Sequence, residues 1–165
     1  MNRALLTSLA TVGLAQFIKA PISQMETGQW KWSTMFKTGG MPSSHSAGVT
    51  ALTTYVALKR GVSSIPFALA GMFSLVVMYD AMGIRRQAGN IATEVNALEE
   101  TVDQLVEQHK PAARDKKEER ARLEESLGHL PVEVLGGVML GIATGALSYL
   151  LEKPDRPNRL LRLFR

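Results

Sequence analysis

The chain of 165 residues contains no cysteine, and this absence excludes several kinds of chemistry at once. Without a thiol the protein cannot form a disulfide, use a cysteine nucleophile or build a metal site on cysteine ligands. Histidine is scarce, with three in the whole chain, and aromatic residues make up only 6% of it. The sequence shows neither an internal repeat nor the polar–apolar alternation typical of β-strands. These features predict an all-α fold with one domain.

Charge is also missing from two long stretches. Residues 62–79 and 134–151 each run for 18 positions without an acid or a base. By contrast, residues 94–125 hold ten acids and six lysines or arginines. Apolar runs of this length match the hydrocarbon core of a bilayer, whereas a soluble domain rarely separates its charges so completely. We therefore predict an integral membrane protein.

Two weaker apolar segments, residues 4–18 and 44–58, bring the expected number of transmembrane helices to about four. The alternative is a compact water-soluble bundle with four core helices. The first segment also resembles a signal peptide, because Arg3 precedes it and small residues lie near its end. We favour a retained membrane anchor, because Lys19 directly after it can serve the site proposed below.

A charged helical insertion is predicted between the third and fourth spans, over residues 90–127. Apolar residues in its first half follow alternating steps of four and three, typical of an amphipathic helix or one strand of a coiled coil: Ile91, Val95, Leu98, Val102 and Leu105. Such a stripe could pair two copies of the chain. Pro111 ends this helix, and a second charged helix is expected over residues 114–127. Residues 1–152 then form one membrane-embedded domain, followed by a basic tail, residues 153–165, suited to anionic lipid headgroups.

Two of the three histidines lie at the expected starts of apolar helices. The segment GGMPSSHSAGVTAL, residues 39–52, places His45 behind small residues and a proline, and GHLPVEVLGG, residues 128–137, does the same for His129. The N-terminus of a helix favours anions, because unpaired N–H groups and the helix dipole attract negative charge there. The two segments point to phosphate chemistry.

Four spans would bring these histidines and several cations to one face of the membrane. The candidate phosphate-binding residues on that face are Lys19, Lys37, Gly40, Ser43, Ser44, Arg85 and Arg86. His129 and Glu133 are four residues apart, so the carboxylate can orient the imidazole and stabilise its charged form. An oriented imidazole can attack phosphorus and become a phosphohistidine, if a second group such as His45 protonates the departing oxygen.

The residues themselves resemble a known superfamily. MPSSHSAGVTAL is similar to the Pro-Ser-Gly-His motif of the type 2 phosphatidic acid phosphatases and vanadium-dependent haloperoxidases, and GHLPVEVLGG is similar to the segment that carries their nucleophilic histidine. The resemblance implies that His129 is the nucleophile, that Glu133 replaces the usual aspartate and that His45 is the general acid. It further implies that Lys19 is the lysine of the first motif and that Arg85 or Arg86 is the arginine of the third.

With DAMGIRRQAG between the two histidine segments, the whole chain resembles small bacterial and plastid membrane proteins that form a divergent branch of this superfamily. It departs from the general pattern in three places. Glu26 and Thr27 stand where the first motif has Arg-Pro, and Ser44 replaces the glycine before the histidine. Arg86 and His129 are 43 positions apart, with the charged insertion between them.

We therefore expect a metal-independent, acid-phosphatase-like membrane hydrolase that needs no cofactor and acts on a lipid phosphate or diphosphate. The alternatives are a catalytically silent membrane scaffold that binds phosphate or anionic lipid, and a vanadate-dependent peroxidase. Asp80 is expected to pair with an arginine rather than to bind a metal with Glu94. No nucleic-acid partner is expected. A small excess of cations on the histidine side favours a cytoplasmic site in the plasma membrane of a bacterium.

Overall fold

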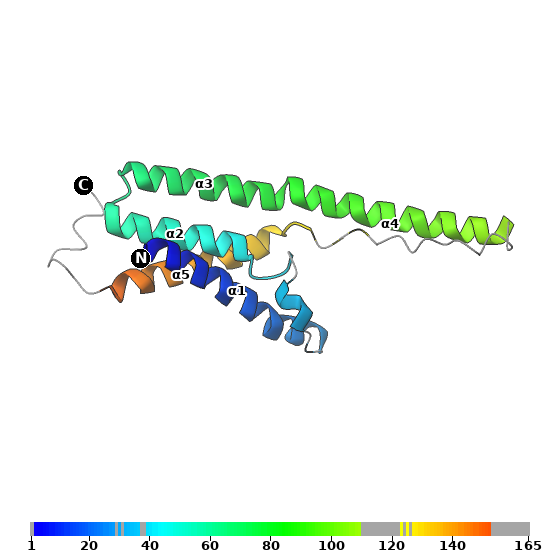
Figure 1. The fold of residues 1–165 in the computed structure, drawn as a ribbon, viewed down its shortest axis with the longest axis horizontal. Helices are drawn as coiled ribbons and strands as arrows, with labels where there is room; N and C mark the ends of the chain where they lie inside the picture. Colours follow the sequence, from blue (N-terminus) through cyan, green and yellow to red (C-terminus); the bar gives the residue numbers. More distant parts are fainter. Residues whose placement is uncertain are drawn as a thin grey trace.

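The computed structural model describes residues 2–28, 30, 32–36, 39–109, 123, 125 and 127–152, and every regular element in them is helical. The elements in chain order are α1 (Arg3–Thr27), the 3-10 helix η1 (Trp32–Phe36), α2 (Ser44–Arg60), α3 (Ile65–Met82), α4 (Ile84–His109) and α5 (Pro131–Leu150). Helices α1, α2, α3 and α5 form a bundle, and α4 projects beyond it (Figure 1). The all-α prediction is confirmed for the residues that the structure describes.

In the described part of the chain, three helical segments are long and apolar enough to cross a membrane: Arg3–Met25, Ile65–Leu105 and Pro131–Leu150. The predicted fourth span, α2, is not among them, since it has 17 residues rich in serine and threonine. Helix α2 packs against α1, α3 and α5 and occupies the centre of the bundle. Much of its surface therefore meets protein rather than lipid, which explains why its sequence is less apolar than that of its neighbours.

Helices α2 and α5 pack at close range along a stripe of glycines on α5, namely Gly137, Gly141 and Gly145. A Cβ atom on Gly141 would lie 2.5 Å from the carbonyl oxygen of Ala47, and one on Gly137 would collide with the carbonyl oxygen of Ser43. Small residues at every fourth position allow helix backbones to approach in this way. Because the contacts advance along both helices in the same direction, α2 and α5 are parallel, and their N-termini lie at the same end of the bundle.

Helix α1 runs in the opposite direction. Near its start, Thr7 Oγ1 lies 2.6 Å from Ser148 Oγ at the end of α5, and Thr11 Oγ1 donates to Thr144 Oγ1 at 2.9 Å. The later part of α1 thus approaches the N-termini of α2 and α5. At the other end of the bundle, Lys59 Nζ pairs with Glu152 Oε1 at 2.6 Å.

The first predicted span, residues 4–18, is too short, because α1 continues to Thr27. Lys19 is therefore a helical residue, and it is buried, with 3% of its surface exposed. The stop signal is Gly28, which adopts a left-handed conformation (φ 70°) and donates its N–H to the Gln24 carbonyl at 2.8 Å. Glycine favours this position because a Cβ atom penalises the left-handed conformation.

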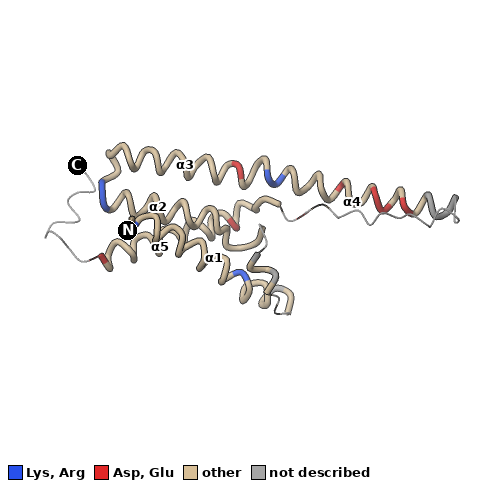
Figure 2. Tube along the Cα trace, viewed as in Figure 1, with Lys and Arg blue, Asp and Glu red and all other residues tan. Residues whose placement is uncertain are grey.

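Helices α3 and α4 are separated only by Gly83 and together form one long rod (Figure 1). The predicted amphipathic helix is confirmed, with its start moved back to Ile84 and its end at His109, just before Pro111. Its apolar stripe is exposed, at Ile91 (61%) and Leu98 (64%) for example, so pairing of two copies stays a prediction. Acids recur along α4, whereas the bundle helices are almost uncharged between their ends (Figure 2).

The side chain of Asn96, on α4, binds the segment at Leu123 and Glu125. Its Oδ1 accepts from the Leu123 N–H at 3.1 Å, and its Nδ2 donates to the Leu123 carbonyl at 3.0 Å and to Glu125 Oε1 at 2.7 Å. Of the charged helix expected over residues 114–127, the described residues 123, 125 and 127 are not helical. Residues 123 and 125 lie against α4 through the hydrogen bonds of Asn96. The predicted tail, residues 153–165, lies outside the described residues.

Candidate active site

The parallel pairing of α2 and α5 brings the two helix starts together, and a backbone contact joins them. Ser43 caps α2: its Oγ accepts from the Ser46 N–H at 3.3 Å and from Ser46 Oγ at 3.0 Å. The Ser43 N–H donates to the Glu133 carbonyl at 2.9 Å. Ser43 and Ser44 are both buried. The Ser43 hydroxyl thus contributes to the architecture of the site as a helix cap.

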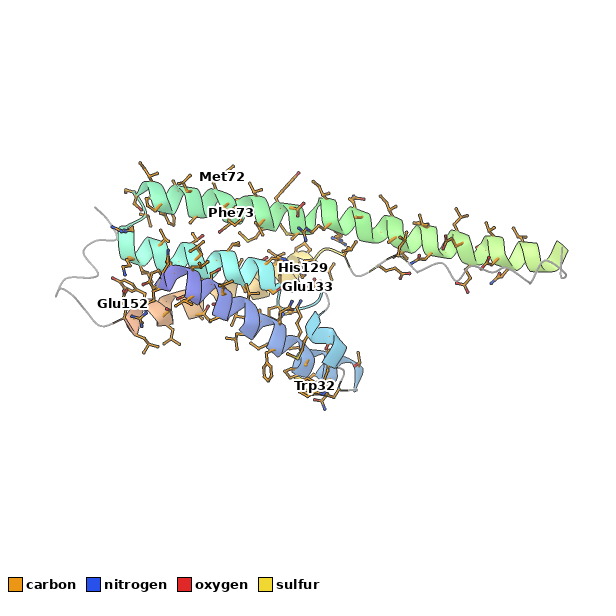
Figure 3. All side chains as sticks on the ribbon, in the orientation of Figure 1. Trp32, Met72, Phe73, His129, Glu133 and Glu152 are labelled. Atoms are coloured by element: carbon orange, nitrogen blue, oxygen red, sulfur yellow. The ribbon has the colours of Figure 1, made fainter. Side chains whose placement is uncertain are left out.

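Glu133 holds His129 in one orientation. The imidazole Nδ1 lies 3.0 Å from Glu133 Oε2, and the same oxygen accepts from the Leu130 N–H at 2.9 Å. The His129 N–H donates to the Ala81 carbonyl at 2.9 Å, which ties the residue to the end of α3. The two side chains lie together at the start of α5 (Figure 3). A carboxylate at Nδ1 favours the tautomer with the proton on that nitrogen, which leaves a lone pair on Nε2.

The other imidazole nitrogen is buried without a partner. His129 is 3% exposed, and its Nε2 makes no hydrogen bond to any described residue. A buried polar nitrogen without a partner is costly, so its presence calls for an explanation. A nucleophile that must reach an incoming phosphorus atom has to keep its lone pair free, and Nε2 meets this requirement.

His45 lies next to His129, as the sequence predicts. The ring centroids are 6.4 Å apart and the ring planes are inclined by 59°. Both rings line a cavity of about 210 Å³, to which Asp80 and Arg85 also contribute. His45 is exposed at the first turn of α2. A group bound in this cavity can therefore be reached by both imidazoles.

Two cations act on these histidines. Lys19, from α1, interacts electrostatically with Glu133 and with both imidazoles. Arg85, at the start of α4, also interacts with both imidazoles, and its Nε donates to Asp80 Oδ2 at 2.6 Å. The expected pairing of Asp80 with an arginine is thus confirmed. A positive region beside two imidazoles is suited to a phosphoryl group.

Three further predicted phosphate ligands, Arg86, Gly40 and Lys37, are not among the described residues that line the cavity with both histidines. Arg86 and Gly40 line a second cavity of about 230 Å³ on the Glu133 side of His129. Lys37 lies outside the described residues. Arg85, rather than Arg86, therefore shares a cavity with both histidines.

The surroundings of His129 lower its pKa. Burial is the largest cause, and the nearby positive charges of Lys19 and Arg85 act in the same direction. The hydrogen bond and the negative charge of Glu133 act against them and raise the pKa. A lowered pKa favours the neutral imidazole, which is the form that can attack phosphorus. Among the described residues, no group of three or more histidines or carboxylates is arranged to hold a metal ion.

Two close backbone contacts that position His129 were missed by the sequence analysis. Gly128 has φ +86°, and a Cβ atom there would collide with the backbone of Arg86 at the start of α4. A Cβ atom on Gly89 would lie 2.6 Å from the Leu127 carbonyl oxygen. Both glycines let the segment before His129 lie directly on α4. A glycine directly before a candidate catalytic histidine is the one visible sign of this packing in the sequence.

The chain is similar to known proteins over most of its length. A family model described as the Divergent PAP2 family matches residues 1–144. An uncharacterized membrane protein of Bacillus subtilis (strain 168), YuiD, is 46% identical over 151 residues, which cover 90% of this chain and 95% of that protein. No solved structure matches the chain.

Proposed function

The chain is a membrane protein that belongs to the divergent PAP2 family, and on this premise we propose that it hydrolyses a lipid phosphate or diphosphate through a phosphohistidine at His129. The observation that carries this proposal is the buried, unpartnered Nε2 of His129 beside a second imidazole. Glu133 at Nδ1 orients the ring so that this nitrogen is the free one.

In the first step, Nε2 of His129 attacks phosphorus, and the bond between phosphorus and the leaving oxygen breaks. His45 gives that oxygen its proton, so an alcohol or a phosphorylated alcohol departs. In the second step, water attacks the phosphohistidine and loses a proton to His45, the P–N bond breaks, and inorganic phosphate leaves. Glu133 stabilises the positive charge that develops on the imidazole, and Lys19 and Arg85 neutralise the phosphoryl oxygens.

We also propose that α2 crosses the membrane as a fourth span. At a rise of about 1.5 Å per residue it extends roughly 25 Å, a little less than the bilayer core. A central helix can be short, because its longer neighbours meet the lipid. The site would then lie at one membrane face, which we place on the cytoplasmic side. Because the chain has no cysteine, a single cysteine at Gln104 on α4 would report this orientation through labelling from either side.

Phosphate release tests the proposed activity. Purified protein in detergent would be given alkyl and prenyl monophosphates and diphosphates, and the phosphoryl-enzyme would be sought as an acid-labile, base-stable label. We expect His129→Ala to abolish both signals, and His109→Ala, at the far end of α4, to retain them. A folded wild-type protein that binds vanadate but hydrolyses none of these substrates or an activated aryl phosphate would instead support the phosphate-binding scaffold.

A further inference from the structure

An apolar groove of about 680 Å³ lies between α3 and α5. Its walls come from residues 72–82 of α3 and residues 131–138 of α5. Among the described residues that line it, none has a charged side chain, and the Tyr79 hydroxyl is the only side-chain oxygen or nitrogen. Several of them are exposed, including Met72 (63%) and Leu135 (63%). Within a bilayer, such a surface meets hydrocarbon.

The groove lies next to the cavity that both histidines line. Val76 lines both of them. Tyr79 lines the groove, and the next residue, Asp80, lines the histidine cavity. On α5, Val134 of the groove directly follows Glu133, the partner of His129. The polar site and the apolar groove therefore lie side by side along α3, which lines both of them.

We infer that this groove binds one hydrocarbon chain of the lipid whose phosphate reaches His129, an inference that rests on the proposed function. An amphiphile with one charged end and one apolar end matches a polar cavity with an apolar groove beside it. At about 30 Å³ for each small group, close to the volume of a water molecule, the groove holds on the order of 20 carbon atoms. This is enough for one long chain rather than two.

The groove orients the substrate more than it attracts it. Lipid chains are as apolar as leucine side chains, so a chain that moves from the bilayer into the groove gains little from the hydrophobic effect. Its gain is in position, since a chain held between α3 and α5 places its phosphate next to Nε2 of His129. Precise placement of reacting groups is a large part of enzymatic rate enhancement.

Photocrosslinking tests the groove without requiring turnover. The probe is a single-chain alkyl monophosphate with a diazirine in its chain, added to the full-length protein in phosphatidylcholine vesicles. We expect the label on residues 72–82 and 131–138, with displacement by the unlabelled alkyl phosphate but not by the corresponding alcohol. Label spread over all the lipid-facing helices, or label in the groove that the alkyl phosphate does not displace, would assign the groove to bulk lipid and overturn the inference.

A matched pair of variants adds a second measurement. Leu135→Trp fills the groove, and Leu147→Trp places the same change on α5 outside it, at a residue of similar exposure (63% and 56%). We expect Leu135→Trp to lower groove labelling, and to lower hydrolysis of the long alkyl phosphate relative to an aryl phosphate by about tenfold. Leu147→Trp should change neither. If the wild-type protein hydrolyses neither substrate, the phosphatase proposal alone is refuted, because the crosslinking still tests whether the groove binds the alkyl chain. Equal labelling of the two variants would refute binding of the alkyl chain in the groove.

Discussion

Arg85 donates its Nε–H to Oδ2 of Asp80 at 2.6 Å, and Asp80 thereby holds the guanidinium beside the cavity that contains both histidines. The next residue, Arg86, lines the neighbouring cavity with Gly40 and Glu133. Successive residues on a helix differ by about 100° in direction, so two adjacent arginines cannot share one position. The structure thus separates two cations that the sequence could not distinguish.

Replacement of these arginines should therefore have unequal effects. We expect Arg85→Ala to lower kcat/KM for an aryl phosphate by roughly 10²- to 10³-fold, because it removes a charge next to the transferring phosphoryl group. Arg86→Ala should cost much less. Asp80→Asn should give a smaller loss than Arg85→Ala, since it frees the guanidinium without removing it. Equal losses at Arg85 and Arg86 would contradict this assignment.

The pH dependence of hydrolysis should report the protonation of His129. Burial and the neighbouring cations lower its pKa, so the neutral nucleophile persists below the usual histidine pKa of about 6.5. The acid limb of kcat/KM should consequently lie below that value. Glu133 raises this pKa, so Glu133→Gln should move the acid limb to still lower pH and also reduce the maximal rate. An acid limb that moves upward in this variant would exclude His129 as the titrating nucleophile.

The loss of hydrolysis rate on removal of His45 should depend on the leaving group. An alkyl alcohol must be protonated as it leaves, so His45→Ala should reduce hydrolysis of an alkyl phosphate by roughly 10²- to 10⁴-fold. An aryl phosphate with a good leaving group should retain much of its rate. Comparison of the two substrates on the same enzyme preparation checks the role, and equal losses on both would show that His45 is not the general acid.

The close approach of α2 and α5 predicts a sharp difference between two glycines. Gly141→Ala would place a Cβ atom 2.5 Å from the Ala47 carbonyl oxygen and should destabilise the fold by about 1–3 kcal/mol. A Cβ atom on Gly71 of α3 would have no described atom within 4 Å, so Gly71→Ala should be neutral or slightly stabilising. Thermal unfolding in detergent measures both. A neutral Gly141→Ala would show that the two helices are farther apart than described.

The exposed stripe on α4 predicts self-association. Val95 and Val102 take one seam position and Leu98 and Leu105 the other, a combination that favours two parallel strands in a coiled coil. Two copies inserted in one membrane in the same orientation would present α4 in parallel. We expect a dimer in detergent that Leu98→Glu dissociates, whereas Ala97→Glu, beside the seam, does not. Monomeric wild-type protein, measured by light scattering, would contradict this prediction.

The local geometry of the candidate site was predictable because it depends on short sequence patterns. Prolines and small residues mark the helix starts that carry His45 and His129, and a spacing of four residues pairs His129 with Glu133. The length of α1 was not predictable in this way, because it depends on the stop at Gly28, and an apolar count ends the helix before Lys19.

Other features were not predictable from sequence patterns, because they depend on how the helices pack. The glycines of α5 fit any apolar span, and only the partner helix α2 shows that they permit a close approach. Helix α2 is more polar than a membrane span usually is, because its neighbours cover it. The different surroundings of Arg85 and Arg86 follow from the direction in which α4 leaves Gly83.

The hydrogen bonds between Asn96 and Leu123 bring together two residues that are far apart in the sequence. The chain between Asn96 and Leu123 is thus an excursion whose two ends are in contact. Gly128 and His129 follow shortly after its second end. The entropic cost of closing such an excursion grows only with the logarithm of its length. The excursion can therefore be lengthened, shortened or replaced by a few turn residues while the geometry of the candidate site stays the same. A motif search with a fixed interval between the arginine and the histidine would overlook such proteins, because the interval is free to vary and only the two anchoring points are constrained.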